Sequence, residues 1–133
     1  MASPQLQPTV TFAPLIPGGA TIDQKTITVY LQLAFSAGFY TVGGVAAGLA
    51  SYVNSLTINT SQFLWGEIKS EEPWTTSLGI GGFTYRYNPL NDTIQIFDGP
   101  ASTGNELTAS QAIPAGVLND IIVGRFTYNR LAQ

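Results

Sequence analysis

The chain has 133 residues, enough for one domain that buries about two thirds of its unfolded surface around a single core. It contains no Cys, which excludes disulfides and thiolate metal sites, and no His, which removes the usual general base and the commonest metal ligand. With only five Lys plus Arg and a net charge of −3, it lacks the basic stripe that nucleic-acid binding requires.

Charged residues make up only 10% of the chain, against a typical ~25%. We expect a protein this poor in charge to cover part of its surface with a partner. No pair of nucleophile and base can be named, so we predict no enzyme, no catalytic residue and no cofactor. Asn91, Asp92 and Asp98 could share a calcium ion, but their side chains are more typical of turn stabilisation, and we predict no metal site.

Residues 1–24 are rich in proline and glycine, which favours an extended N-terminal arm ahead of a β-sandwich domain over residues 25–133. We predict that the apolar side chains of the arm contact a neighbouring subunit or add a strand to its sheet. A disordered terminus is the alternative. These candidate contact residues are Val10, Phe12, Leu15 and Ile16.

The first strong strand pattern is Thr26–Phe35, where apolar residues alternate with mostly polar ones, so the strand should line the core. The glycine-rich segment from Gly38 to Tyr52 predicts a long loop with a short helical turn through Val45–Leu49. Strands are then expected at Val53–Thr60 and Phe63–Ser70, and Gly66 in the second indicates a bulge.

A membrane-spanning segment is the alternative interpretation of Leu31–Ala50, which carries no charge and contains a G-x-x-x-G pair. We disfavour it because the segment begins with strand-like alternation, contains four glycines and has no nearby basic flank. Residues 1–7 also lack the cationic start and apolar stretch of a signal peptide, so export by that route is not expected.

Residues 82–97 predict a β-hairpin with a turn from Asn88 to Asp92. Phe83, Tyr85 and Tyr87 should lie on one face of it. A last strand, Ile121–Arg130, places its even-numbered residues on one face and its odd-numbered residues on the other. With no amphipathic helix of ten residues or more, the fold class is all-β, a single-domain β-sandwich or jelly-roll-like fold.

Four aromatic residues could form a stacking platform for sugars, although aromatics in a small sandwich more often enter the core or an interface. They are Trp65, Trp74, Tyr85 and Tyr87.

The order of motifs over residues 26–130 is specific enough to suggest a family. A core strand ending in Phe35 precedes Gly43-Gly44, the hairpin Phe83-Thr-Tyr-Arg-Tyr to Thr93-Ile-Gln-Ile-Phe97 follows, and Ile113-Pro-Ala-Gly116 leads to the closing strand. In this order the chain resembles the small cement, or capsid-decoration, proteins of tailed bacteriophages.

The resemblance implies a jelly-roll-like sandwich that assembles as a homotrimer on the outer face of the phage head. There it would bridge subunits of the major capsid protein and stabilise the virion, with no nucleic-acid or membrane partner. The alternative function is a carbohydrate- or receptor-binding module of a phage fibre or tail.

Overall fold

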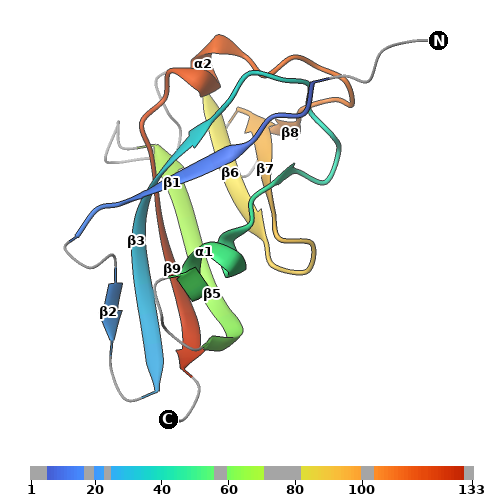
Figure 1. Ribbon diagram of the computed structural model, residues 1–133. Coiled ribbons are helices and arrows are strands. Elements are labelled where there is room, and N and C mark those ends of the chain that lie inside the picture. Colours follow the sequence, from blue (N-terminus) through green and yellow to red (C-terminus); the bar gives the residue numbers. More distant parts are fainter. Residues whose placement is uncertain are drawn as a thin grey trace.

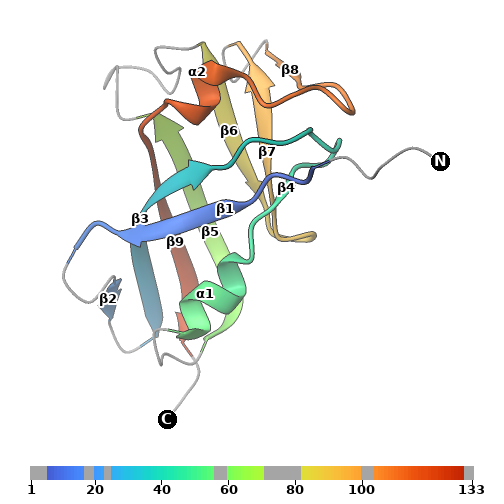
Figure 2. The same ribbon diagram turned by 45° about the horizontal axis from the view of Figure 1, so that its top comes forward.

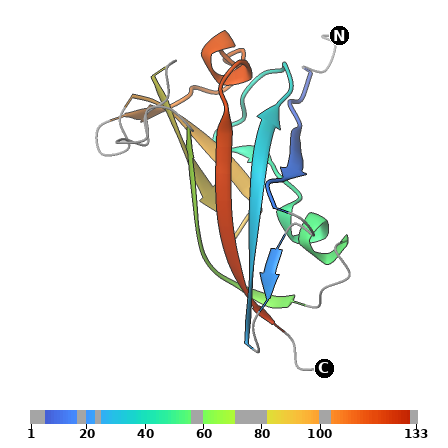
Figure 3. The same cartoon turned by 90° about the vertical axis from the view of Figure 1, so that its left-hand side faces the viewer.

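The computed structural model describes residues 6–16, 20–22, 25–55, 60–70, 82–99 and 104–130. Most of these residues belong to two antiparallel sheets that bury one shared apolar core, with two short helices at the margins (Figure 1). The strands of the smaller sheet cross those of the larger sheet obliquely (Figure 3). The prediction of an all-β sandwich is confirmed.

The larger sheet has five strands in the order β1-β3-β9-β5, and β2 pairs with β3 next to β1. The strand nearest the C-terminus, β9, therefore lies between β3 and β5. Their bounds are β1 (Val10–Pro14), β2 (Ala20–Ile22), β3 (Thr26–Phe35), β5 (Thr60–Ser70) and β9 (Ile122–Arg130).

The smaller sheet is built on the predicted hairpin, which the structure confirms as β6 paired with β7. Two short strands, β4 and β8, pair with the other edge of β7. Tyr85 and Phe83 are buried against the larger sheet, as their alternation predicts. The bounds are β4 (Val45–Ala46), β6 (Phe83–Asn88), β7 (Thr93–Asp98) and β8 (Asn105–Glu106).

The strands β3 and β9 follow the predicted alternation closely. The odd-numbered residues of β3 from Ile27 to Phe35 are buried, while its even-numbered residues lie on the opposite face. In β9 the buried residues Ile122, Phe126 and Tyr128 face the core. One sheet face therefore forms the core, and the other is left available on the outside.

The predicted bulge in β5 lies near Gly66 but not at it. The register with β9 shifts between Phe63 and Trp65, which makes Leu64 the extra residue. Gly66 has a different role, because a Cβ there would come within 2.6 Å of the Phe126 ring. Its missing side chain leaves room for a fully buried aromatic ring on the neighbouring strand.

The N-terminal segment, where it is described, pairs with its own chain. β1 runs antiparallel to the second half of β3, and β2 to the first half. Proline is tolerated there because an edge strand leaves one side of its backbone without a ladder partner. The boundary after residue 24 stays a prediction, but strands on both sides of it belong to one sheet.

Two short helices, α1 (Leu49–Ser55) and α2 (Ala115–Leu118), complete the fold (Figure 2). The helix α1 corrects the expectations for this region: Val45 begins a strand, and Val53 is helical where a strand was expected. The helix forms because Leu49 and Val53, one turn apart, are both fully buried. Residues 56–59 of the expected strand lie outside the described residues.

The segment Leu31–Ala50, considered above as a membrane span, is divided among β3, a loop, β4 and the start of α1. Neither helix in the described ranges has the length and apolar composition of a membrane-spanning helix.

Candidate functional site

The four apolar residues of the N-terminal segment do not share one surface. Val10 and Phe12 point to the core side of β1, and the ring of Phe12 lies 5.2 Å from that of Tyr52 on α1. Leu15 follows β1 on the opposite face and is 48% exposed. Ile16 is half-buried. Only Leu15 therefore contributes to the surface described next.

The exposed face of the larger sheet, called the outer face below, carries side chains in rows that cross the strands. These rows follow from the antiparallel register, which places one residue of each strand opposite its neighbour. The central row contains Leu15, Tyr30, Arg125 and Glu67. The rows on either side contain Ala13, Gln32, Val123 and Lys69, and Thr21, Thr28, Thr127 and Trp65.

Arg125 connects the rows near β5. Its Nη2 atom donates to Oε1 of Glu67 at 2.9 Å, and its guanidinium carbon lies 4.8 Å from the centre of the Trp65 ring. Both contacts are partly exposed, so each contributes at most about 1 kcal/mol to stability. Their main effect is to hold three large side chains in a defined arrangement on a rigid sheet.

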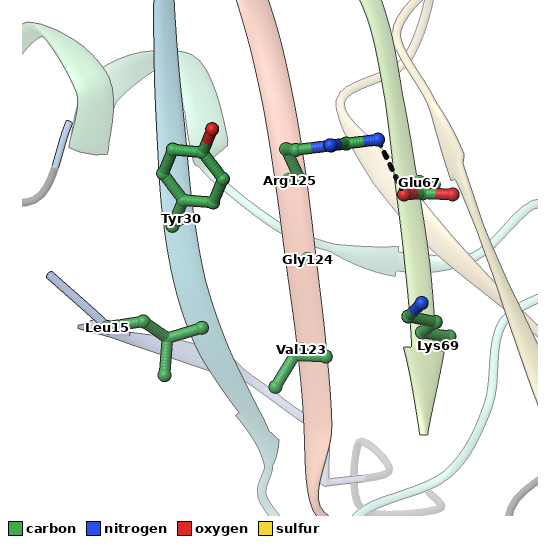
Figure 4. A pocket seen from close by; sticks show the side chains of 7 residues that line it. All are labelled: Leu15, Tyr30, Glu67, Lys69, Val123, Gly124 and Arg125. Atoms are coloured by element: carbon green, nitrogen blue, oxygen red, sulfur yellow. Dashed lines mark hydrogen bonds and ion pairs between the residues drawn. The ribbon is translucent and has the colours of Figure 1, made fainter. Parts of the chain in front are cut away.

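A groove of about 200 Å³ crosses the outer face beside this row (Figure 4). Leu15 and Tyr30 border it on one side, the side chains of β5 border it on the other, and Val123 lies between them (Figure 4). The groove forms because Val123 is shorter than the side chains of the neighbouring row. The complete lining is Leu15, Tyr30, Glu67, Lys69, Val123, Gly124 and Arg125.

The charge around β5 has the opposite sign to that of the whole chain. Three of the five basic residues, Lys69, Arg86 and Arg125, line this groove or a second one of about 360 Å³ between β5 and β6. Glu67 is the single acid among the residues that line either groove. Within the described parts of the chain, Lys69 makes no ion pair. Counted over the described residues, this surface is thus locally positive on a chain of net charge −3.

Three buried or half-buried tyrosines in the described part of the chain donate hydrogen bonds to carboxylates. Tyr40 donates to Glu106 at 2.5 Å, Tyr85 to Asp120 at 2.8 Å, and Tyr87 to Asp92 at 2.6 Å. Burial, and then the hydrogen bond to the carboxylate, raise the pKa of each of these phenols far above its usual value. The phenols therefore stay protonated and tie loops to sheets.

Two other groupings considered from the sequence are not brought together. Asp92 and Asp98 lie at opposite ends of β7, about 20 Å apart for a six-residue strand. No cluster of three potential metal ligands occurs among the described residues. Of the proposed sugar platform, Trp65 is on the outer face, Tyr85 and Tyr87 face the interior, and Trp74 lies outside the described residues.

The outer face was not identified from the sequence because it depends on register. Leu15, Tyr30, Arg125 and Glu67 are widely separated along the chain, and only strand pairing aligns them. The available signals were the alternation in residues 26–35, which places Tyr30 on the non-core face, and that in residues 121–130, which places Val123 and Arg125 on one face.

No protein-family model matches the chain, and no curated protein or solved structure shows significant similarity to it. The fold defines it as a β-sandwich protein, and the larger sheet presents the outer face to solvent.

Proposed function

We propose that this chain is a non-enzymatic structural protein of a tailed-bacteriophage virion. In this proposal it is a cement protein that binds the outer face of the head, bridges major capsid subunits and acts as a homotrimer. The sequence resemblance over residues 26–130 supports the role, and the β-sandwich fold is compatible with it. A cement protein needs a rigid framework and an adhesive surface, not a reaction centre.

The observation that carries the proposal is the arrangement of Trp65, Arg125 and Tyr30 on the outer face. Tyr, Trp and Arg are the residue types that contribute most to protein interfaces. Trp65 is 47% exposed, and Arg125 already contacts both Trp65 and Glu67 in the free chain. Side chains that are ordered before binding lose less conformational entropy when a partner covers them.

A trimer would raise the overall affinity for the head above that of a single outer face. Three copies of the outer face on one assembly bind neighbouring capsid subunits with a high effective concentration, so no single contact needs to be tight. The exposed ion pair, together with Thr21 and Thr28 on this face, suits an interface that is also stable in water.

The test is sedimentation of the purified chain with heads of the encoding phage that were assembled without it. We expect the wild type to sediment with heads, and Trp65→Ala and Arg125→Ala to lower head occupancy at least tenfold, the loss expected for a central interface residue. Thr41→Ala, on an exposed loop outside the larger sheet, is the matched control and should bind normally. A wild-type chain that binds no form of the head contradicts the proposal.

A carbohydrate- or receptor-binding module of a phage fibre or tail is the second candidate, and the exposure of Trp65 favours it. Arg125 covers part of the Trp65 ring, however, so a sugar would have to displace it or use the opposite ring face. Millimolar sugar affinity, lost in Trp65→Ala and combined with no head binding, would favour this function over the cement role.

A further inference from the structure

The geometry points to a specific occupant of the groove on the outer face: an extended segment of a partner protein that presents an aliphatic side chain two residues from a carboxylate. This inference rests on the proposed function, because it specifies the chemistry of the capsid segment that the cement protein binds. It depends on three features of the groove: its size, its apolar side, and a cation that has no ion-pair partner among the described residues.

The size of the groove restricts what it can hold. At about 200 Å³ it falls below the ~300–1,000 Å³ of pockets that enclose a small-molecule ligand or cofactor. At about 30 Å³ per water molecule, it holds the equivalent of roughly seven waters. It is therefore suited to one or two side chains from a segment that passes over the sheet.

The apolar side of the groove is formed by Leu15 and Val123, whose side chains face the same hollow, with the ring of Tyr30 above them (Figure 4). Leu15 is 48% exposed, although it is fixed by a 2.9 Å backbone hydrogen bond from its N–H to the carbonyl of Tyr30. An aliphatic side chain placed between Leu15 and Val123 would remove both from water.

The opposite side of the groove offers a cation. Lys69 lies directly across from Val123 in the register of β5 with β9, and it has no ion-pair partner among the described residues. Arg125 is different, because its charge is already matched by Glu67. A carboxylate of the partner would therefore pair with Lys69, which attracts acidic segments to this face of an otherwise acidic chain.

The distance between Lys69 and the apolar side of the groove determines how far apart the two binding residues of the partner must be. Lys69 is one strand away from Val123, about 5 Å, and Leu15 is farther on the other side. In an extended segment, side chains at i and i+2 point to the same side and are about 7 Å apart. The aliphatic residue and the carboxylate should therefore be at positions i and i+2.

A second copy of this chain packed face to face is the less favourable occupant. Such packing would bring Lys69 and Arg125 of one copy near the same cations of the other, with only Glu67 on each side to offset them. The trimer of the proposed function would then use a different surface, which leaves the outer face free for the capsid.

The first test uses the isolated chain and needs no phage. The probe is an acetylated and amidated pentapeptide, Thr-Leu-Thr-Asp-Thr, titrated into ¹⁵N-labelled protein, with an otherwise identical peptide carrying Asn in place of Asp. We expect amide shifts at Tyr30, Lys69 and Val123 with a Kd of about 1 mM, and about fivefold weaker binding of the Asn peptide. Lys69→Gln should abolish the difference between the peptides.

Shifts that map elsewhere, equal affinity for the two peptides, or no shift at millimolar peptide would each overturn the inference. A concentration-dependent sedimentation coefficient of the chain alone that Lys69→Glu abolishes would also overturn it, because it would identify a second copy as the occupant.

The second test separates this inference from the proposed function. Lys69→Glu should reduce binding to heads at least tenfold, while Lys25→Glu, which makes the same charge change just before β3, should bind as the wild type does. If the wild type and both variants bind heads equally, the cement function stands and the groove assignment is wrong. If no protein binds heads, the peptide titration alone decides the chemistry of the groove.

Discussion

The hydroxyl of Tyr87 donates a 2.6 Å hydrogen bond to Oδ1 of Asp92, and the same oxygen accepts the backbone N–H of Leu49 at 3.1 Å. One carboxylate oxygen therefore joins the hairpin β6–β7 to the first turn of α1. Asp92 also has a φ of 53°, a left-handed conformation that Asp and Asn adopt more readily than most residues.

Replacing Asp92 should consequently be more costly than replacing its exposed neighbour. We expect Asp92→Ala to lower the free energy of unfolding by about 2–3 kcal/mol, because two hydrogen bonds to a charged acceptor are lost. Asp92→Asn should cost less, since it keeps an acceptor oxygen and tolerates the positive φ. Urea unfolding measures both, and Asn91→Ala is the control, expected to change stability by about 0.5 kcal/mol or less. Equal losses for Asp92→Ala and Asn91→Ala would refute this role.

Tyr87 and Tyr128 provide a matched pair of hydroxyl deletions. The hydroxyl of Tyr87 is bonded to Asp92, whereas that of Tyr128 is buried beside the Tyr87 hydroxyl without a well-formed hydrogen bond among the described residues. Tyr87→Phe should destabilise the protein by about 1–2 kcal/mol, and Tyr128→Phe should be neutral or stabilise it by up to about 1 kcal/mol. Thermal unfolding of the two variants, whose ring volumes are unchanged, makes the comparison. The opposite order would show that the Tyr128 hydroxyl is satisfied.

The absence of a side chain at Gly124 should contribute to stability, because the ring of Phe126 occupies the space that a side chain would take. A Cβ at Gly124 would lie 2.6 Å from Cε2 of Phe126, so Gly124→Ala should cost about 1–3 kcal/mol through overpacking. Phe126→Leu should offset part of this cost, so that the double variant is more stable than the sum of the single effects by about 0.5 kcal/mol or more. Strict additivity in denaturant unfolding would mean that the ring and the glycine do not compete for space.

High pH should unfold the protein through its buried phenols. Burial is the largest cause that raises the pKa of four tyrosines above their usual value of 10.0, and nearby carboxylates add to the effect. Below pH 10 the phenols are protonated in both states and their contribution to stability is fully present. Above pH 10 only the unfolded chain readily releases these protons, so stability falls as pH rises. The four are Tyr40, Tyr85, Tyr87 and Tyr128.

The measurement follows tyrosinate absorbance and circular dichroism together during a rise in pH. Ionisation of these four tyrosines should coincide with loss of the β signal. If all six tyrosines ionise while the circular dichroism stays native, the buried hydrogen bonds do not hold the phenolic protons.

Local pattern was sufficient to predict some parts of the fold. The alternation of Thr26–Phe35 and of the last strand, and the turn residues between β6 and β7, identified strands that are confirmed. The helical turn predicted through Val45–Leu49 was placed too early, because the first N–H of α1 is capped by Asp92, 43 positions away in the sequence. A seven-residue helix has little propensity of its own, so a remote acceptor and tertiary packing decide where it forms.

The candidate site was less predictable than the fold, for a related reason. Leu15 belongs to a proline-rich segment that indicates an arm, yet pairing with β3 brings it to the edge of a groove. The contact of Arg125 with Trp65 depends on the bulge at Leu64, which shifts the register of β5. Such alignments arise from strand pairing over long sequence separations and leave no local signal.

The position of β9 between β3 and β5 has a consequence for synthesis of the protein. On the ribosome, β3 and β5 emerge well before Ile122–Arg130, and neither can complete its ladder until that strand arrives. The hydrogen-bond ladders of the larger sheet should therefore form late and in one step. Until then, β3 and β5 each have one long edge with no strand paired to it. During that interval the unpaired edges of β3 and β5 are exposed to mispairing with other nascent chains.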